Sequence, residues 1–275
     1  DIRGRVKSEG YTKYNLLVTS GTWRTASEVN KPLWEHWVVL YVPDVITSNR
    51  AFLFIDGGSN SANPPSGGDI DLYGGAMAVV TGAVLVDLFT VPNQPLQFAG
   101  ESFTRSEDSI IAYSWRKFLE TGDETWPANL PMTRSAVRAM DAVMDFLGSP
   151  VGGNNDVESF IVAGASKRGW TTWLASAVDP RVSFAVPIVI DLLNMQSSFV
   201  HHYAYYNGAF SPAVQDYVNE GILDVDNFGT EGINTLLSIV DPYTYRDRLT
   251  MPKLILNASG DEFFVPDSWQ FYYDS

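Results

Sequence analysis

The sequence predicts an α/β fold with a mostly parallel central sheet and helices on both faces. Short runs rich in β-branched and aromatic residues alternate with longer helical patterns, which is typical of crossover connections between parallel strands. The 275 residues are enough for one large α/β domain, and no internal repeat or low-complexity tract divides them. We therefore expect a single domain over residues 1–275.

Seven runs predict the strands of this sheet. Five of them are apolar nearly throughout, which indicates strands covered on both faces. A glycosylation sequon, Asn257-Ala258-Ser259, directly follows the run KLIL, so we expect it at the end of a buried strand. In chain order the predicted strands are YNLLVTS, HWVVLYVP and the five apolar runs AFLFIDG, AVLVDLF, SFIVAG, SFAVPIVI and KLILNAS.

Three segments have the pattern of apolar residues expected for helices. In SEDSIIAYSWRKFLE, Ser106 is placed to cap the helix, with acidic residues in the first turn. The segment TRSAVRAMDAVMDFLG ends on Gly148, a common helix terminator, and the third segment is KRGWTTWLASAV. Two stretches, ETGDETWPANLPMT and GSPVGGNNDVES, have the composition of surface loops.

The regular alternation breaks down in residues 194–240, which contain many aromatic residues and no clean strand pattern. We expect this segment to be an insertion that lies over the strand ends as a lid. Large apolar side chains in such a segment either join the core or line a pocket. The candidates for lining the pocket are Tyr203, Tyr205, Tyr206 and Phe210.

Charge and composition exclude several classes of function. With 32 acidic and 18 basic residues the net charge is −14, which argues against a nucleic acid or an anionic membrane as partner. There is no cysteine, so disulfides and thiolate metal sites are excluded, and three histidines are too few for a histidine-rich metal cluster. The most apolar window, GAMAVVTGAVLVDLF, is too short to span a bilayer.

Ser166 lies between an apolar run and a helical pattern, in the sequence IVAGASKRGWTTW. A serine on a tight turn between a strand and a helix, with glycine on both sides, fits the nucleophile elbow of an α/β-hydrolase. The helix N-terminus there offers free N–H groups to a developing oxyanion. We expect a positive φ at Ser166, because the nucleophile must project from a sharp turn. The alternative is an ordinary turn in which Ser166 only caps the helix.

Two further strand ends complete the pattern. The run AFLFIDGGSN places Gly58 where a hydrolase of this architecture needs its second oxyanion N–H. The run KLILNASGDEFF ends with Asp261, which follows the serine in the chain order expected of the triad acid. Asp191 also closes an apolar run and competes for this role, but chain order favours Asp261. We expect Gly58, Ser166 and Asp261 at the same, carboxyl-terminal edge of the sheet.

Six stretches of the chain form a more specific pattern than any single motif. They are LFIDGGSN, VPNQPL, SEDSIIAYSWRKFL, WPANLPM, AGASKRGWTTWL and DPYTYRDRLTMPKLILNASGDEFFVPD. Together they resemble the PhoPQ-activated pathogenicity-related proteins, a family that looks like α/β-hydrolases and includes the eukaryotic autocrine proliferation repressor. The resemblance extends from about Trp34 to the C-terminus. It implies Ser166 as nucleophile, Asp261 as acid, a secreted or periplasmic location and a poorly defined substrate.

The residues after the serine are cationic. The elbow is similar to that of glucuronoyl esterases, in which an arginine after the nucleophile is credited with oxyanion stabilisation; here Lys167 occupies that place, followed by Arg168. Such a cation can stabilise tetrahedral charge or select an anionic substrate. Alternatively, both side chains are solvated or paired within the structure.

The general base is the one part of a triad that these residues do not supply. The family resemblance implies a histidine some tens of residues after the acid, and none lies between Asp261 and Ser275. His36 falls in an early strand pattern and is expected to be structural, while His201 and His202 lie in the predicted lid. We expect Ser166 and Asp261 to flank a gap the size of an imidazole, open to solvent or filled by water or a partner chain.

The sequence therefore predicts a serine hydrolase that acts by acyl transfer on an ester or amide, without a metal or organic cofactor. Ser166 would attack the carbonyl, and the backbone N–H groups of Gly58 and Lys167 would bind the oxyanion. Asp261 would orient the missing histidine. The alternatives are a secreted signalling or binding protein on a hydrolase scaffold, and a structural subunit of an assembly, because fold does not determine function.

Overall fold

The computed structural model of the protein describes residues 1–65 and 73–274. Within these residues a seven-stranded sheet forms the centre, in the order β1-β2-β3-β5-β4-β6-β7. Its strands are β1 (Ile2–Ser8), β2 (Tyr11–Thr22), β3 (Leu33–Pro43), β4 (Arg50–Ile55), β5 (Leu85–Leu88), β6 (Ser159–Ala165) and β7 (Val182–Ile188).

The sheet is mixed. Strands β5, β4, β6 and β7 pair in parallel, and β1, β2, β3 and β5 pair antiparallel. Strand β1 was not predicted, because IRGRVKS has few apolar residues; the strand is mostly exposed and lies at the sheet edge. The α/β class itself is confirmed, since helices cover both faces.

Seven α-helices accompany the sheet in the described residues. Helices α3 and α4 pack on the face that carries Val38, Leu53 and Val162, whereas α1 packs on the opposite face against Trp37 and Tyr41. The helices are α1 (Gly74–Thr81), α2 (Asp108–Thr121), α3 (Asn129–Leu147), α4 (Lys167–Val178), α5 (Met195–Tyr205), α6 (Gln215–Asn219) and α7 (Glu231–Val240). No helix among the described residues is long and apolar enough to cross a membrane.

Helix α4 matches its predicted range at both ends, but two expectations about α2 and α3 were wrong. Ser106 does not cap α2: Glu107 occupies the cap position with a φ of 55° and no side-chain cap bond. Helix α3 begins at Asn129, inside the stretch expected to be a surface loop. Asn129, Pro131 and Met132 of its first turn are buried, and the Trp115 indole donates a hydrogen bond to Asn129 Oδ1 at 2.9 Å.

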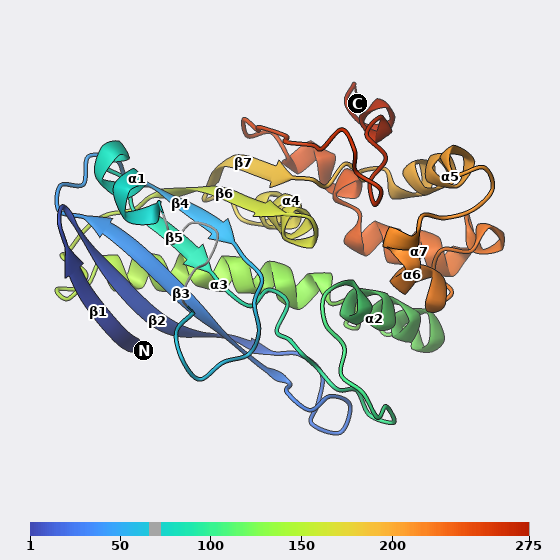
Figure 1. Cartoon of the computed structure of the whole chain (residues 1–275), viewed down its shortest axis with the longest axis horizontal. Helices are drawn as coiled ribbons and strands as arrows, with labels where there is room; N and C mark the ends of the chain where they lie inside the picture. The colour runs from blue at the N-terminus through green and yellow to red at the C-terminus, as the bar shows by residue number, and fades with distance from the viewer. Residues whose placement is uncertain (66–72, 275) are drawn as a thin grey trace.

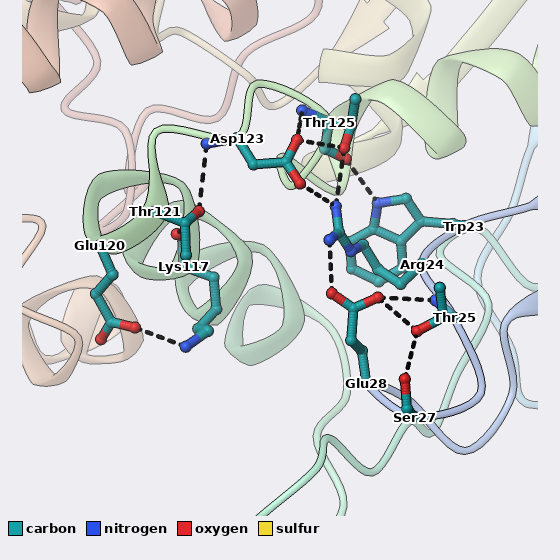
Figure 2. Close-up of polar contacts among 10 residues, drawn as sticks. All are labelled: Trp23, Arg24, Thr25, Ser27, Glu28, Lys117, Glu120, Thr121, Asp123 and Thr125. Carbon is teal, nitrogen blue, oxygen red and sulfur yellow. Dashed lines mark hydrogen bonds and ion pairs between the residues drawn. The ribbon is translucent and has the colours of Figure 1, made fainter.

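Contacts with the β2–β3 connection hold the rest of that predicted loop. Arg24 donates hydrogen bonds to Asp123 at 2.9 Å and to Thr125 at 2.8 Å, and its guanidinium also pairs with Glu28 (Figure 2). The Trp23 indole donates to the Thr125 carbonyl at 3.1 Å (Figure 2). Asp123 and Thr125 lie about 100 residues after Trp23 and Arg24 in the chain, so a local sequence pattern could not reveal these contacts.

The predicted strand KLILNAS is only partly formed. It meets β7 through two isolated parallel bridges, Ala185 to Lys253 and Ile188 to Leu256, without a regular ladder. Most of residues 253–259 are exposed, including Asn257 of the sequon. The expectation that the sequon ends a buried strand was therefore wrong, because within the described residues this segment has a strand partner on one side only.

Residues 194–240 form α5, α6 and α7, which lie beyond the arrowheads of β4, β6 and β7 (Figure 1). Short 3₁₀ turns join them, at Pro212–Val214 and Val225–Asn227, and two more follow at Pro242–Arg248 and Ser268–Phe271. Tyr217 of α6 packs against Trp115 of α2, with the two rings 5.3 Å apart. The segment is thus at the strand ends, as expected, and its function as a lid stays a prediction.

Candidate active site

Ser166 lies on the turn that joins β6 to α4. Its φ of 56° and ψ of −126° confirm the predicted positive φ, which is rare for a residue with a side chain. The Ser166 N–H donates to the Ile188 carbonyl at 2.8 Å, so β7 fixes the turn. Its hydroxyl makes no cap bond to α4, which excludes the alternative of a simple helix cap. Strained backbone of this kind marks functional sites.

A glycine before the serine allows β6 and α4 to approach each other. A Cβ atom added to Gly164 would lie 2.6 Å from the Arg168 carbonyl oxygen, on the first turn of α4. Real Cβ atoms do not come this close to a backbone oxygen, so any larger residue would push the helix away from the strand. The glycine two positions before Ser166 is thus needed for the close approach of strand and helix, as the nucleophile-elbow pattern predicts.

Gly58 lies at the same edge of the sheet as Ser166. Strands β4 and β6 are parallel neighbours with Ile55 opposite Gly164, so both chains leave the sheet side by side. Gly58 has a φ of 110°, which disfavours any residue with a side chain. Among the described residues, neither the Gly58 N–H nor the Lys167 N–H donates a hydrogen bond, so both remain available to an oxyanion.

The Lys167 side chain is paired within the structure. Its buried ammonium contacts Glu107 at 2.9 Å and Asp108 at 2.8 Å, both at the start of α2. Arg168 donates to Glu107 at 2.6 Å and to the Val91 carbonyl at 2.6 Å. Of the two alternatives for these cations, the structure favours pairing, so only the backbone N–H of Lys167 remains a candidate for substrate contact.

Sequence reasoning missed the acidic partner of these cations. Burial alone would raise the pKa of Glu107, but the hydrogen bond and charge of Arg168, with the charge of Lys167, outweigh burial and lower that pKa to about 2. The only sequence signal was indirect: SEDS and VPNQPL lie in the stretches that carry the family resemblance. Neither stretch contains a pattern that predicts a contact between Glu107 and the residues after Ser166.

We expect Glu107 to make the stability of the protein sensitive to acid. Because its folded pKa is about 2 against an ordinary value of 4.5, its stabilisation is present above about pH 4.5 and lost as pH falls toward 2. After a discount for solvent screening of a side chain that is 38% exposed, this amounts to about 1–2 kcal/mol. Urea unfolding between pH 2 and pH 6 should show a shallower pH dependence for Glu107→Gln than for wild type. Parallel curves would contradict the assignment.

Asp261 and Asp191 differ in what their carboxylates already bind. Asp261 is half-buried, and its Oδ1 accepts the N–H groups of Phe263 and Phe264 at 2.9 and 3.0 Å. Among the described residues its Oδ2 takes no hydrogen bond. Asp191 is buried at 2% exposure and accepts the Tyr272 hydroxyl at 2.6 Å. Burial raises the pKa of Asp191, and the charges of Asp267 and Asp261 raise it further.

His36 is a structural residue, as expected. Its buried ring forms hydrogen bonds with the hydroxyls of Ser20 and Ser135, each at 2.9 Å, and with the Phe89 carbonyl at 3.1 Å. Burial lowers the pKa of His36 to about 4, so the ring is neutral near pH 7.

The two histidines of α5 are engaged elsewhere. His201 Nε2 lies 2.8 Å from an Asp267 carboxylate oxygen, and its ring packs edge-on against Phe271. His202 is buried against Tyr206 and Phe210, with ring centroids 4.8 and 5.8 Å away, and burial lowers its pKa. Within the described residues no histidine bonds to Ser166. The packing alternative holds for His202, and the imidazole-sized gap beside Ser166 stays a prediction.

The family model of the PhoPQ-activated pathogenicity-related proteins matches residues 1–275. The chain belongs to this family. A curated relative, autocrine proliferation repressor protein A of Dictyostelium discoideum, is 43% identical over 275 residues. These residues are 100% of this chain and 54% of the relative. The chain thus spans about half the length of the curated relative that it matches. The resemblance expected from the motifs is confirmed.

Solved structures share the fold at low identity. Acetyl xylan esterase 1 of Thermoanaerobacterium sp. matches with a TM-score of 0.65 and 15% identity, over 100% of this chain and 77% of that one. The acylaminoacyl peptidase of Pyrococcus horikoshii matches with a TM-score of 0.55 and 14% identity, over 98% of this chain and 35% of that one. The protein has the α/β-hydrolase fold.

Proposed function

We propose that this family member is a serine hydrolase that transfers an acyl group from an ester or amide to water. The observation that carries the proposal is the positive φ of Ser166 at the end of β6. Beside it, at the end of the neighbouring strand β4, lies the loop of residues 56–60, here called the Gly58 loop. A serine held in strain next to two unused backbone N–H groups has the parts for nucleophilic attack and oxyanion binding.

The proposed reaction proceeds in two steps. A base removes the proton of the Ser166 hydroxyl as its oxygen attacks the carbonyl carbon, and the Gly58 and Lys167 N–H groups bind the oxyanion. The base then protonates the leaving alcohol or amine as the acyl–oxygen or acyl–nitrogen bond breaks. Water hydrolyses the acyl-enzyme by the same route in reverse order.

A histidine is the base that this scheme needs, with Asp261 as its orienting acid. We assign that role to a histidine outside residues 1–275, as the family resemblance implies. Asp261 supports the scheme because one carboxylate oxygen is anchored by backbone N–H groups while the other makes no bond in the described chain. A secreted or periplasmic location is part of the same proposal.

The rival function is signalling or binding without turnover. It is suggested by the name of the relative in Dictyostelium discoideum, a proliferation repressor. In that case the hydrolase scaffold would act through its surface, and Ser166 would have no reactivity beyond that of an ordinary serine.

A fluorophosphonate probe separates the two functions. The full-length protein should be labelled once per chain, at the peptide that contains Ser166, and should hydrolyse p-nitrophenyl acetate. A correctly folded full-length protein that neither labels nor hydrolyses the ester would refute the hydrolase and favour the binding function.

A further inference from the structure

Gln94 links the Gly58 loop to the start of α2. Its side-chain Nε2 donates to the Gly58 carbonyl at 2.8 Å and to Glu107 Oε1 at 2.5 Å. Its backbone carbonyl accepts the Asn60 N–H at 2.6 Å, so this one residue holds the loop on both sides of Ser59. Gln94 is itself buried, with 5% exposure.

Glu107 continues this link to the nucleophile elbow. Its N–H donates to Gln94 Oε1 at 2.7 Å, which makes the contact between the two residues reciprocal. Its carboxylate receives Arg168 on one oxygen at 2.6 Å and Lys167 on the other at 2.9 Å. An unbroken chain of polar contacts thus runs from Gly58 through Gln94 and Glu107 to the residues that follow Ser166.

The same loop is also fixed from the strand side. The Thr90 N–H donates to the Gly57 carbonyl at 2.6 Å. Because the peptide between Gly57 and Gly58 is planar, holding that carbonyl sets the direction of the Gly58 N–H. Thr90 and Glu107 both have positive φ, at 66° and 55°, and neither is glycine. Thr90 contacts the Gly58 loop directly and Glu107 contacts it through Gln94. Strained backbone at both residues indicates that the geometry of this loop is functionally important.

Such a demand follows from the chemistry of an oxyanion hole. The two N–H donors come from different elements, the β4 loop and the start of α4, and both must lie about 3 Å from one oxygen position. An error of about 1 Å in such a site can lower the rate by about 100-fold. A charge-assisted link between the two elements, through the buried Gln94 and the partly exposed Glu107, would fix the relative position of the two donors.

We propose that Gln94 and Glu107 are positioning residues that hold the Gly58 N–H and the nucleophile elbow in the geometry required to bind the oxyanion. The inference rests on the hydrolase proposed above. Neither residue touches the substrate: Gln94 acts through the Gly58 carbonyl, and Glu107 acts through Gln94 and the two cations after Ser166.

The test uses the full-length protein with p-nitrophenyl acetate. Gln94→Glu keeps the shape of the side chain but replaces the donor to the Gly58 carbonyl with an acceptor. We expect kcat to fall by about 30–100-fold with KM changed by less than about twofold, because the lost interaction acts in the transition state. Fluorophosphonate labelling of Ser166 should slow by a similar factor. The matched control is Gln97→Glu, because Gln97 also donates to a backbone carbonyl, that of Glu101 at 2.8 Å.

A double exchange separates positioning from folding. Gln94→Glu with Glu107→Gln keeps the net charge and the reciprocal contact between the two residues, but no amide donor faces the Gly58 carbonyl. We expect the double variant to melt above Gln94→Glu, because two carboxylates no longer face each other, but below wild type, because an amide at position 107 cannot form ion pairs with Arg168 and Lys167. Its kcat should stay low. Recovery of kcat, or a Gln94→Glu variant within twofold of wild type, would overturn the inference alone. A wild-type protein without turnover or labelling would instead refute the hydrolase, and this inference with it.

Discussion

Ser166→Ala is expected to lower kcat/KM of the full-length protein toward p-nitrophenyl acetate by about 10⁴-fold or more, to the level of binding and oxyanion stabilisation alone. The strained turn should persist, because its φ is held by the hydrogen bond from the Ser166 N–H to Ile188 and by the packing of β6 on α4. The melting temperature should therefore stay near that of wild type.

Ser176→Ala is the matched control for this variant. Ser176 lies in the same helix, α4, and its hydroxyl donates to the Thr172 carbonyl at 2.7 Å, away from the elbow. Its removal should leave the rate unchanged. A Ser166→Ala protein with more than about a tenth of wild-type activity would show that another group is the nucleophile.

The second large effect is expected on kcat when the triad acid is replaced, and it distinguishes Asp261 from Asp191. Asp261→Asn should lower kcat by about 10³–10⁴-fold, because an asparagine holds the histidine base in the wrong tautomer. Asp191→Asn should change kcat little, since the Asp191 carboxylate is buried and bound to the Tyr272 hydroxyl.

Measurement of both variants under the same conditions tests the assignment by chain order. Asp191→Asn should lower the melting temperature, since it weakens the buried hydrogen bond from the Tyr272 hydroxyl to residue 191. The reverse pattern, with a large loss of kcat for Asp191→Asn and none for Asp261→Asn, would move the acid to Asp191.

The parts of the site that the sequence predicted are those with local causes. Gly164, Ser166 and helix α4 follow one another in the chain, so a strand–turn–helix pattern shows itself within about fifteen residues. The Gly58 loop follows its strand in the same way. Because β4 and β6 pair in parallel, the Gly58 loop and Ser166 leave the sheet at the same edge.

The parts that it missed depend on distant partners. Glu107 meets Arg168 across 61 positions of the chain, and Gln94 meets Gly58 across 36. Burial of Asn129 beneath Trp115 moved the start of α3 into a stretch whose composition is that of a loop. In each case tertiary contacts, which a single sequence does not display, override the local pattern.

The most direct test of the site is a crystal structure of the full-length protein after reaction with a fluorophosphonate, which leaves a tetrahedral phosphorus that mimics the intermediate. We expect the phosphorus on Ser166 Oγ and one phosphonyl oxygen about 2.7–3.1 Å from both the Gly58 and Lys167 nitrogens. A phosphorus bound to another residue, or a phosphonyl oxygen directed away from these two N–H groups, would contradict the account.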